Sequence, residues 1–332
     1  MHTRPLGPSG IEASVVAFGA WAIGGWRWGG TDEAQAIRAV HAAIDAGITL
    51  FDTAPVYGFG LSDSILGQAL AGKRDKIILA TKCGLICDPT KGVKHFSTNA
   101  LNFDDDGLIQ VNRHSGGESI RREVEASLRR LKTDHLDLLQ THWQDTLTPF
   151  GETMQAMLDL KKEGKIRAIG VCNATSQQMA QYQAAGQLDS DQEKYSMLFR
   201  GIEKDQLPYC QNHSMAMLAY SPLAQGLLTG KLTADRQFVL GDLRRNNPAF
   251  AGNVRSNVAQ MLAKFEPIRE TLGITMTQLV IAWTLEQPGL THALCGARTP
   301  EQAIENAGAG DVKLTSEQIA AMTAAVDAYG TA

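Results

Sequence analysis

Short apolar runs alternate with longer amphipathic segments along most of the chain. The apolar runs are rich in β-branched and aromatic residues, and the segments between them repeat apolar positions with a helical period of about 3.6 residues. The runs predict strands at 15–19, 49–53, 76–81, 136–142, 166–172, 188–193, 216–220 and 292–295. The segments between them predict helices at 31–46, 61–70, 118–131, 149–163, 176–185, 204–211, 276–286 and 300–307.

This alternation predicts an α/β fold in which a (β/α)8 TIM barrel forms a single domain. Successive strand–helix units with right-handed crossovers favour a closed barrel over an open doubly wound sheet. An open dinucleotide-binding sheet requires a helix directly after its glycine fingerprint, and the glycines of 19–25 have no helix start close behind them. No linker divides the pattern, so we expect one domain over 1–332 with an N-terminal hairpin. Two long connections, 84–117 and 221–253, follow strand ends at the face of a barrel that carries active sites.

Composition and charge narrow the class of protein. The apolar share of 44% and the charged share of 20% are typical of globular proteins. The net charge of -4 provides no basic field for nucleic acid or anionic lipid. Prolines and glycines interrupt residues 1–19, which therefore lack the apolar core of a signal or spanning helix. We expect a cytoplasmic protein without nucleic-acid or membrane partners, and the sequence leaves its oligomeric state open.

The cysteines do not form a pattern typical of a metal site. They are Cys83, Cys87, Cys172, Cys210 and Cys295, an odd number, which favours reduced thiols. Cys83 and Cys87 are close in sequence, but no second Cys or His pair at ligand spacing accompanies them. We therefore predict no metal.

Four titratable side chains lie at the ends of neighbouring predicted strands. Asp52 and Tyr57 follow the second strand, Lys82 ends the third, and His142 ends the fourth. Taken alone, Asp52 is typical of a turn cap and Tyr57 of a phenol packed in the core. Lys82 is typical of a solvated charge, and His142 of a histidine whose hydrogen bonds are satisfied. Because the carboxyl ends of barrel strands share one rim, we expect the four to converge there.

The chemistry of these residues fits proton donation to a carbonyl oxygen. The positive charge of Lys82 would lower the pKa of Tyr57, making proton transfer feasible near neutral pH. Asp52 would pair with Lys82 and offset the cost of burying its ammonium group. His142 would donate a hydrogen bond to the substrate oxygen and orient it.

Several ordered motifs resemble those of the aldo-keto reductases, which are NAD(P)H-dependent (β/α)8-barrel oxidoreductases. They are F-D-T-A with a tyrosine downstream, A-T-K, D-L-L-Q-T-H-W, G-V-C-N, Q-E-K-Y-S, A-Y-S-P-L-A-Q-G-L-L-T-G-K and G-A-R-T-P-E-Q-A-I-E-N. The resemblance runs from Gly19 to about Ala309. It implies that Tyr57 is the general acid, that Lys82 and Asp52 tune its pKa, and that His142 orients the carbonyl.

The same resemblance implies where a nicotinamide cofactor binds. It assigns the carboxamide to Asn173 and Gln192, with Cys172 in place of a common serine, and the stacked ring to Tyr220. The residues implied for the pyrophosphate are Ser221, Leu223, Gln225 and Gly226. Those implied for the adenosine are Gly296, Arg298, Gln302, Glu305 and Asn306. Gln144 departs from the family pattern, because a proline often follows the His-Trp pair.

The last of these motifs favours NADP over NAD on physical grounds as well. A helix that opens near Thr299 presents free N–H groups, and Arg298 ahead of it adds donors matched to phosphate oxygens. The alternative is that Glu305 accepts a ribose hydroxyl of a cofactor that lacks the 2′-phosphate.

Indole rings suit a pocket for an aldehyde, a ketone or a sugar-like or cyclic carbonyl compound, and we expect Trp21, Trp26 and Trp143 to line it with Tyr57. The predicted function is therefore NAD(P)H-dependent interconversion of carbonyls and alcohols. One alternative is a cofactor-binding interaction subunit similar to the channel β-subunits. Another is a barrel aldolase or isomerase with Lys82 as a Schiff-base lysine, which explains none of the cofactor motifs. The carboxylates at 104–106 are more typical of a solvated loop than of a cation site.

Overall fold

The computed structural model describes residues 1–99 and 109–330, and a closed parallel barrel lies at its centre. The barrel strands are β3 (Val16–Gly19), β4 (Leu50–Asp52), β5 (Ile78–Cys83), β9 (Leu136–Thr141), β10 (Ile166–Cys172), β11 (Ser190–Lys194), β12 (Ala216–Tyr220) and β13 (His292–Gly296). They follow one another around the barrel in sequence order, and β13 closes it by pairing in parallel with β3. The predicted (β/α)8 fold is confirmed.

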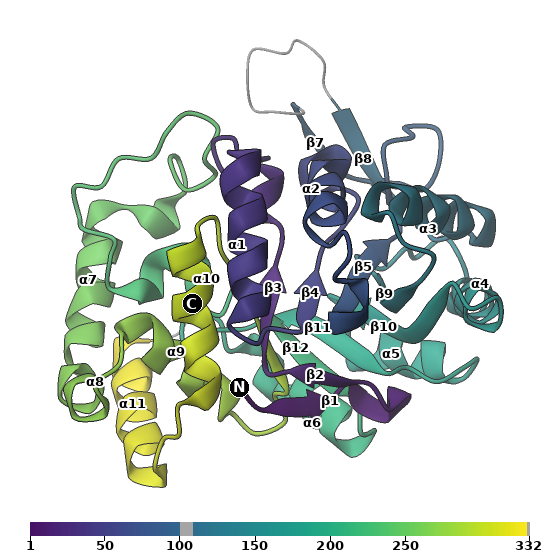
Figure 1. Ribbon diagram of the computed structural model, residues 1–332. Helices are drawn as coiled ribbons and strands as arrows, with labels where there is room; N and C mark the ends of the chain where they lie inside the picture. The colour runs from purple at the N-terminus through teal and green to yellow at the C-terminus, as the bar shows by residue number, and fades with distance from the viewer. Residues whose placement is uncertain (100–108, 331–332) are drawn as a thin grey trace.

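Helices surround this barrel on its outer side (Figure 1). They are α1 (Glu33–Asp45), α2 (Leu61–Ala69), α3 (Gly117–Leu131), α4 (Phe150–Lys162), α5 (Ser176–Gln183), α6 (Gln206–Asn212), α7 (Gly252–Ala263), α8 (Glu266–Leu272), α9 (Met276–Leu285), α10 (Pro300–Gly308) and α11 (Ser316–Tyr329). The sequence prediction missed α7, α8 and α11. Helix α8 is short and α11 is rich in alanine, so neither has the strong apolar stripe from which helices are predicted.

The N-terminal hairpin lies at the amino ends of the barrel strands. Its strands β1 (Thr3–Pro5) and β2 (Glu12–Ser14) pair antiparallel, as predicted. Leu6 and Ile11 from this hairpin are buried in one apolar cluster with Leu50, Leu138 and Leu218 of the barrel strands. The hairpin therefore fills the end of the barrel opposite the predicted site.

The connection at 84–117 contains a small antiparallel sheet, where the sequence predicted only a long polar loop. Its strands are β6 (Leu85–Ile86), β7 (Val93–Thr98) and β8 (Ile109–Arg113), in the order β6–β8–β7. Figure 1 shows β7 and β8 beyond the carboxyl end of the barrel. Val111 and Phe96 of this sheet pack in one apolar cluster with Trp26 and Trp143. The carboxylates at 104–106 lie outside the described residues.

A buried carboxylate fixes the register of the strands that carry two predicted catalytic residues. Asp137 Oδ2 of β9 accepts from the Leu79 N–H of β5 at 2.8 Å and from Arg74 at 2.7 Å. Its Oδ1 accepts from Arg167 of β10 at 2.5 Å. Strand β5 begins two residues later than predicted and continues to Cys83, so Lys82 lies within the strand and its backbone is held rigidly.

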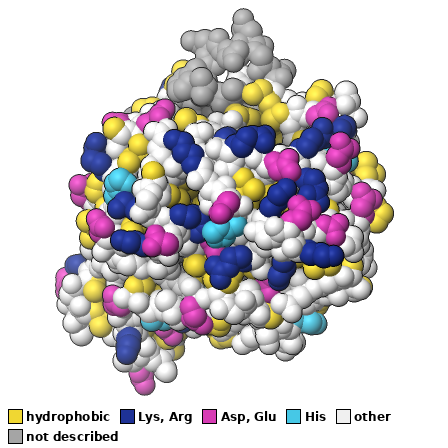
Figure 2. Space-filling view, turned by 45° about the vertical axis from the view of Figure 1, so that its right-hand side comes forward, with side chains coloured by type: hydrophobic (Ala, Val, Ile, Leu, Met, Phe, Trp, Pro, Cys, Tyr) yellow, Lys and Arg dark blue, Asp and Glu magenta, His cyan; other side chains and the backbone are white. Residues whose placement is uncertain are grey.

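Charges of both signs are mixed on the surface. On the face shown in Figure 2, Lys and Arg side chains alternate with Asp and Glu, so no continuous basic surface forms there. Among the described residues, no helix is long and apolar enough to cross a membrane. The five cysteines are free thiols, and the described part of the chain gathers no group of three or more His, Cys, Asp or Glu suited to a metal ion.

Candidate active site

A cavity of about 750 Å³ opens at the carboxyl ends of the barrel strands. It extends from the predicted catalytic residues to the start of α10, and the connections after β3, β5 and β12 form its walls. The predicted site residues that line it are Trp21, Trp26, Asp52, Tyr57, His142, Trp143, Asn173, Gln192, Tyr220, Ser221, Leu223, Gln225, Gly226, Gly296, Arg298, Gln302, Glu305 and Asn306. Lys82 and Cys172 are the two predicted residues outside this lining.

Lys82 lies directly beneath the floor of the cavity. Its Nζ donates to Asp52 Oδ1 at 2.5 Å and to the Thr53 carbonyl at 3.0 Å. The same nitrogen lies 5.0 Å from the centre of the Tyr57 ring. The side chains of Lys82 and Asp52 are only 1% and 3% exposed, so this ion pair is screened from water. The predicted pairing of these two residues is therefore present, immediately below the phenol.

The pKa of Tyr57 does not move in the direction that the sequence predicted. Burial raises the pKa of Tyr57 to about 12, and the positive charge of Lys82 opposes that shift without overcoming it. For Lys82, burial is the largest cause and acts to lower the pKa, but the charge and hydrogen bond of Asp52, together with the acidic groups of Tyr57 and Cys172, outweigh it and raise the pKa above its ordinary value. The phenol is therefore protonated and the ammonium charged at neutral pH. Proximity to a cation alone could not reveal this, because the depth of burial decides the sign.

The second oxygen of Asp52 is held by two buried amides. Gln192 Nε2 donates to Asp52 Oδ2 at 3.0 Å, and Gln140 Nε2 donates to it at 3.3 Å. The sequence analysis missed Gln140. Its signal was a polar side chain two residues before His142, on the same face of the strand as the apolar Leu138. These amides fix the carboxylate, so its other oxygen remains directed at Lys82.

His142 lies beside Tyr57 as a neutral ring. The two rings are 5.6 Å apart and nearly perpendicular. Burial, with a smaller contribution from the charge of Lys82, lowers the pKa of His142 well below its ordinary value. A neutral imidazole carries one N–H donor, so Tyr57 and His142 can together donate two hydrogen bonds to one substrate oxygen.

Asn173 connects the catalytic group to the next part of the cavity. It has a positive φ of 55° directly after β10. Its Nδ2 donates to the His142 carbonyl at 2.9 Å, and its Oδ1 accepts from the Tyr220 hydroxyl at 2.9 Å. Asn173, Gln192 and Tyr220, which the sequence grouped, therefore lie together along the cavity lining.

The predicted contact of Cys172 with a cofactor is not supported. Its thiol is buried and does not line the cavity. Gln144 contacts the backbone of this residue. Its Nε2 donates to the Cys172 carbonyl at 2.7 Å, and its Oε1 accepts from the Tyr182 hydroxyl at 2.9 Å. The glutamine that replaces the usual proline thus supports the rim behind Trp143.

Aromatic residues enclose the cavity on the side of Tyr57. Trp26 stacks on Phe96 of β7 at 5.6 Å, and Trp143 lies 4.8 Å from the ring of His95. Both His95 and Phe96 line the cavity, although the sequence analysis did not single them out. They lie in a segment without a clear strand pattern, so only the folded sheet brings them over the barrel.

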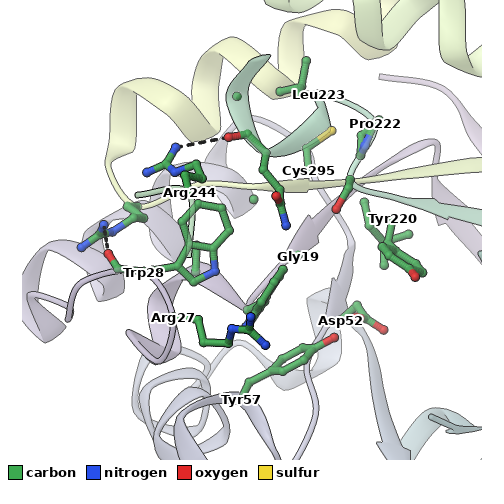
Figure 3. Close-up of a pocket in the computed structure, with 18 of the residues that line it drawn as sticks. Gly19, Arg27, Trp28, Asp52, Tyr57, Tyr220, Pro222, Leu223, Arg244 and Cys295 are labelled. Carbon is green, nitrogen blue, oxygen red and sulfur yellow. Dashed lines mark hydrogen bonds between the residues drawn. The ribbon is translucent and has the colours of Figure 1, made fainter. Parts of the chain in front are cut away.

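Charged and amide groups fill the far end of the cavity. Arg298 donates to the carbonyls of Trp28 at 3.0 Å and Gly30 at 2.7 Å, so it bridges to the connection after β3. The bond to the Trp28 carbonyl is drawn as a dashed line in Figure 3. Lys231 forms an ion pair with Glu305 at 2.6 Å. Sequence spacing could not reveal these partners, because they come from distant parts of the chain.

Comparison with known proteins gives consistent matches. The model of the aldo/keto reductase family matches residues 15–327. The NADH-specific methylglyoxal reductase of Escherichia coli (strain K12) is 39% identical over 321 residues, which cover 95% of each chain. The structure of a glycerol dehydrogenase from Gluconobacter oxydans superimposes with a TM-score of 0.86 at 39% identity, covering 99% of this chain and 96% of that one. An aldo/keto reductase from Klebsiella pneumoniae in complex with NADP and acetate gives a TM-score of 0.73 at 29% identity, covering 97% and 94%.

The electrostatics of His142 give a testable prediction. Because its folded pKa is lowered, the ring should stay neutral as the pH falls from about 8 to about 5.5, where an unperturbed histidine becomes protonated. Its ring nitrogen resonances, followed by NMR and assigned by comparison with His142→Gln, should therefore not shift over this range. A titration with a midpoint near the usual value of about 6.5 would contradict the account of the site.

Proposed function

This chain belongs to the aldo/keto reductase family and is an oxidoreductase of carbonyl and alcohol groups, and from that premise we propose that Tyr57, Lys82, Asp52 and His142 form its catalytic group. The observation that carries the assignment is the buried Lys82–Asp52 pair directly beneath a protonated tyrosine. A cofactor-bound interaction subunit, the alternative role, would leave this complete group unexplained.

The residues around the cavity fit a nicotinamide dinucleotide. Asn173 and Gln192 present amide groups beside Tyr220, whose ring offers a flat surface for the nicotinamide. The side-chain oxygen Oε1 of Gln192 has no hydrogen-bond donor within the described residues, so it can accept from the carboxamide. The bound reduced cofactor supplies a hydride to the carbonyl carbon.

The chain itself supplies the proton and holds the substrate oxygen. Tyr57 donates its hydroxyl proton to the oxygen as negative charge develops there. Lys82 stabilises the tyrosinate that results, and Asp52 keeps the ammonium in place. His142 donates its single N–H to the same oxygen and fixes its direction. In the oxidation of an alcohol, these proton movements are reversed.

We propose NADP(H) as the preferred cofactor. Lys231, Arg236, Arg244 and Arg298 all line the cavity and outnumber the acids paired with them, Glu305 and Asp242, which suits a 2′-phosphate. Glu305, which could instead accept a ribose hydroxyl, is already paired with Lys231. The Klebsiella neighbour has NADP bound, whereas the E. coli relative is NADH-specific, so coenzyme choice differs among these relatives.

The proposed substrates are aldehydes and ketones, including sugar-like and cyclic ones. The aromatic wall of Trp21, Trp26 and Trp143 buries the apolar part of such molecules, while Tyr57 and His142 bind the carbonyl oxygen. Relatives named for methylglyoxal and glycerol are consistent with small oxygenated substrates.

Removing the phenolic hydroxyl should stop the chemistry and spare cofactor binding. Tyr57→Phe keeps the ring but has no proton to donate, so kcat for carbonyl reduction should fall by about 10²–10⁴-fold. The Kd for NADPH should stay within about twofold of the wild-type value, which is a smaller change in binding free energy than the roughly 1.4 kcal/mol of a tenfold change in Kd. Tyr209→Phe, which removes a hydroxyl bonded to Gln183 away from the cavity, is the matched control. Turnover by Tyr57→Phe near that of the control would refute the assigned role.

The preference for NADP can be tested through Arg298. Arg298→Ala removes the guanidinium and should raise the KM for NADPH by about tenfold or more, because a charge-assisted hydrogen bond contributes on that scale. The KM for NADH should change much less, since NADH has no 2′-phosphate. Initial rates with both coenzymes measure this ratio. Arg245→Ala, which removes an exposed arginine outside the cavity lining, serves as the control. The proposal would be wrong if the wild type used NADPH and NADH equally well and Arg298→Ala left the ratio of their KM values unchanged.

A further inference from the structure

The guanidinium group of Arg27 enters the cavity without a bound partner. Arg27 lies between Trp26 and Trp28 in the connection after β3, and Figure 3 shows its guanidinium on the side of Tyr57. It lies 5.6 Å over the ring of Trp26, but no hydrogen bond or ion pair joins it to any described residue. In contrast, Arg244, in the same lining, is paired with Asp242 at 2.6 Å.

The backbone holds Arg27 in a conformation that is costly for a residue with a side chain. Its φ is 62°, in the left-handed region that disfavours residues with a side chain. The Leu243 N–H donates to the Arg27 carbonyl at 2.9 Å, which fixes this part of the wall against the connection after β12. The backbone that carries the Arg27 side chain is therefore constrained.

Two further indole rings on the connection that carries Arg27 also line the cavity. The indole N–H groups of Trp21 and Trp28 are buried and have no acceptor within the described residues. The two indoles contact edge to face with ring centres 5.4 Å apart, and Trp21 lies 6.2 Å from the ring of Tyr57. A guanidinium group is always charged and can only donate hydrogen bonds, so the natural ligand of Arg27 is an oxygen anion.

The charge of Arg27 is not neutralised by the acids of the cavity. Asp52 is bound to Lys82, and Glu305 is paired with Lys231 at the far end. Arg27 is itself exposed, so its charge is open to a ligand that enters the cavity. An anion in this part of the cavity would therefore meet an uncompensated positive charge beside the proton donor.

We propose that Arg27 forms a subsite for a carboxylate on the substrate, beside the indole rings of Trp21 and Trp28. The preferred substrates are then aldehydes or ketones that carry a carboxylate, with the carbonyl at Tyr57 and the carboxylate at Arg27. This inference rests on the proposed function and names the substrate class of the same site.

A pair of aldehydes that differ only in the carboxylate tests the subsite. With NADPH, the wild type should show a higher kcat/KM for 4-carboxybenzaldehyde than for benzaldehyde. Arg27→Met keeps an unbranched stem against Trp26 but removes the charge and the donors. It should lower kcat/KM for the carboxylated aldehyde by about tenfold or more, and that for benzaldehyde by less than about threefold.

Two further variants separate a specific subsite from a general charge effect. Arg27→Lys retains the charge and should keep part of the preference, and Arg245→Ala should keep all of it because Arg245 does not line the cavity. Equal losses for both aldehydes in Arg27→Met, or no loss for either, would overturn the proposal. A rise in the KM for NADPH with both aldehydes would also overturn it, since Arg27 would then serve the cofactor phosphates.

A binding measurement keeps this test independent of turnover. Quenching of tryptophan fluorescence in the protein loaded with NADP⁺ gives the Kd values of 4-(hydroxymethyl)benzoate and benzyl alcohol. The carboxylate should bind more tightly to the wild type, and Arg27→Met should abolish the difference. If no aldehyde is reduced, the proposed function fails, but carboxylate-selective binding that depends on Arg27 would still support the subsite. Equal binding of the two alcohols to the wild type would refute it.

Discussion

The ion pair of Lys82 and Asp52 is the interaction on which the rest of the site depends. A buried pair is stable only when its geometry is good and its remaining donors and acceptors are satisfied. Here the barrel supplies those partners from its own strands. Gln140 and Gln192 hold one carboxylate oxygen, and the Thr53 carbonyl accepts a second hydrogen bond from the ammonium. The polar interior at this end of an otherwise apolar barrel is therefore explained by one charge that must be kept beneath the cavity.

The same burial gives the two residues above the pair their chemical states. Burial raises the pKa of Tyr57 and lowers that of His142, so both rings are neutral and each carries a proton to donate. Lys82 becomes most important when Tyr57 loses its proton, because it then faces a tyrosinate. The strand ends thus hold the side chains that take part in proton transfer in fixed positions. The connections after β3 and β12 and the β7 strand shape the space around it, which separates the reaction from the choice of substrate.

The sequence predicted those features that follow from local pattern. Alternating apolar runs and amphipathic segments were enough to predict the barrel. Four residues could be predicted to lie at one rim because they occupy strand ends, namely Asp52, Tyr57, Lys82 and His142. The pKa shift of Tyr57 was predicted in the wrong direction, because local sequence shows a neighbouring charge but not the depth of burial.

Other features depend on contacts between distant segments. The sheet that brings His95 over the site forms within a connection whose composition resembled a loop. Arg298 was correctly placed in the cavity, but its bonds to carbonyls 270 and 268 residues away could not be inferred from spacing. Cys172 was assigned to the cofactor site from its place in a motif, but its thiol is buried and does not line the cavity.

The central claim is that the charge of Lys82 enables proton donation by Tyr57. The most direct test is kcat for the reduction of a simple aldehyde by Lys82→Met at saturating NADPH, with circular dichroism and NADPH binding measured to establish that the variant is folded. The account predicts that kcat falls by about 100-fold or more, the usual contribution of proton transfer by a positioned side chain. A folded variant that binds NADPH and retains kcat within about twofold of the wild type would contradict it.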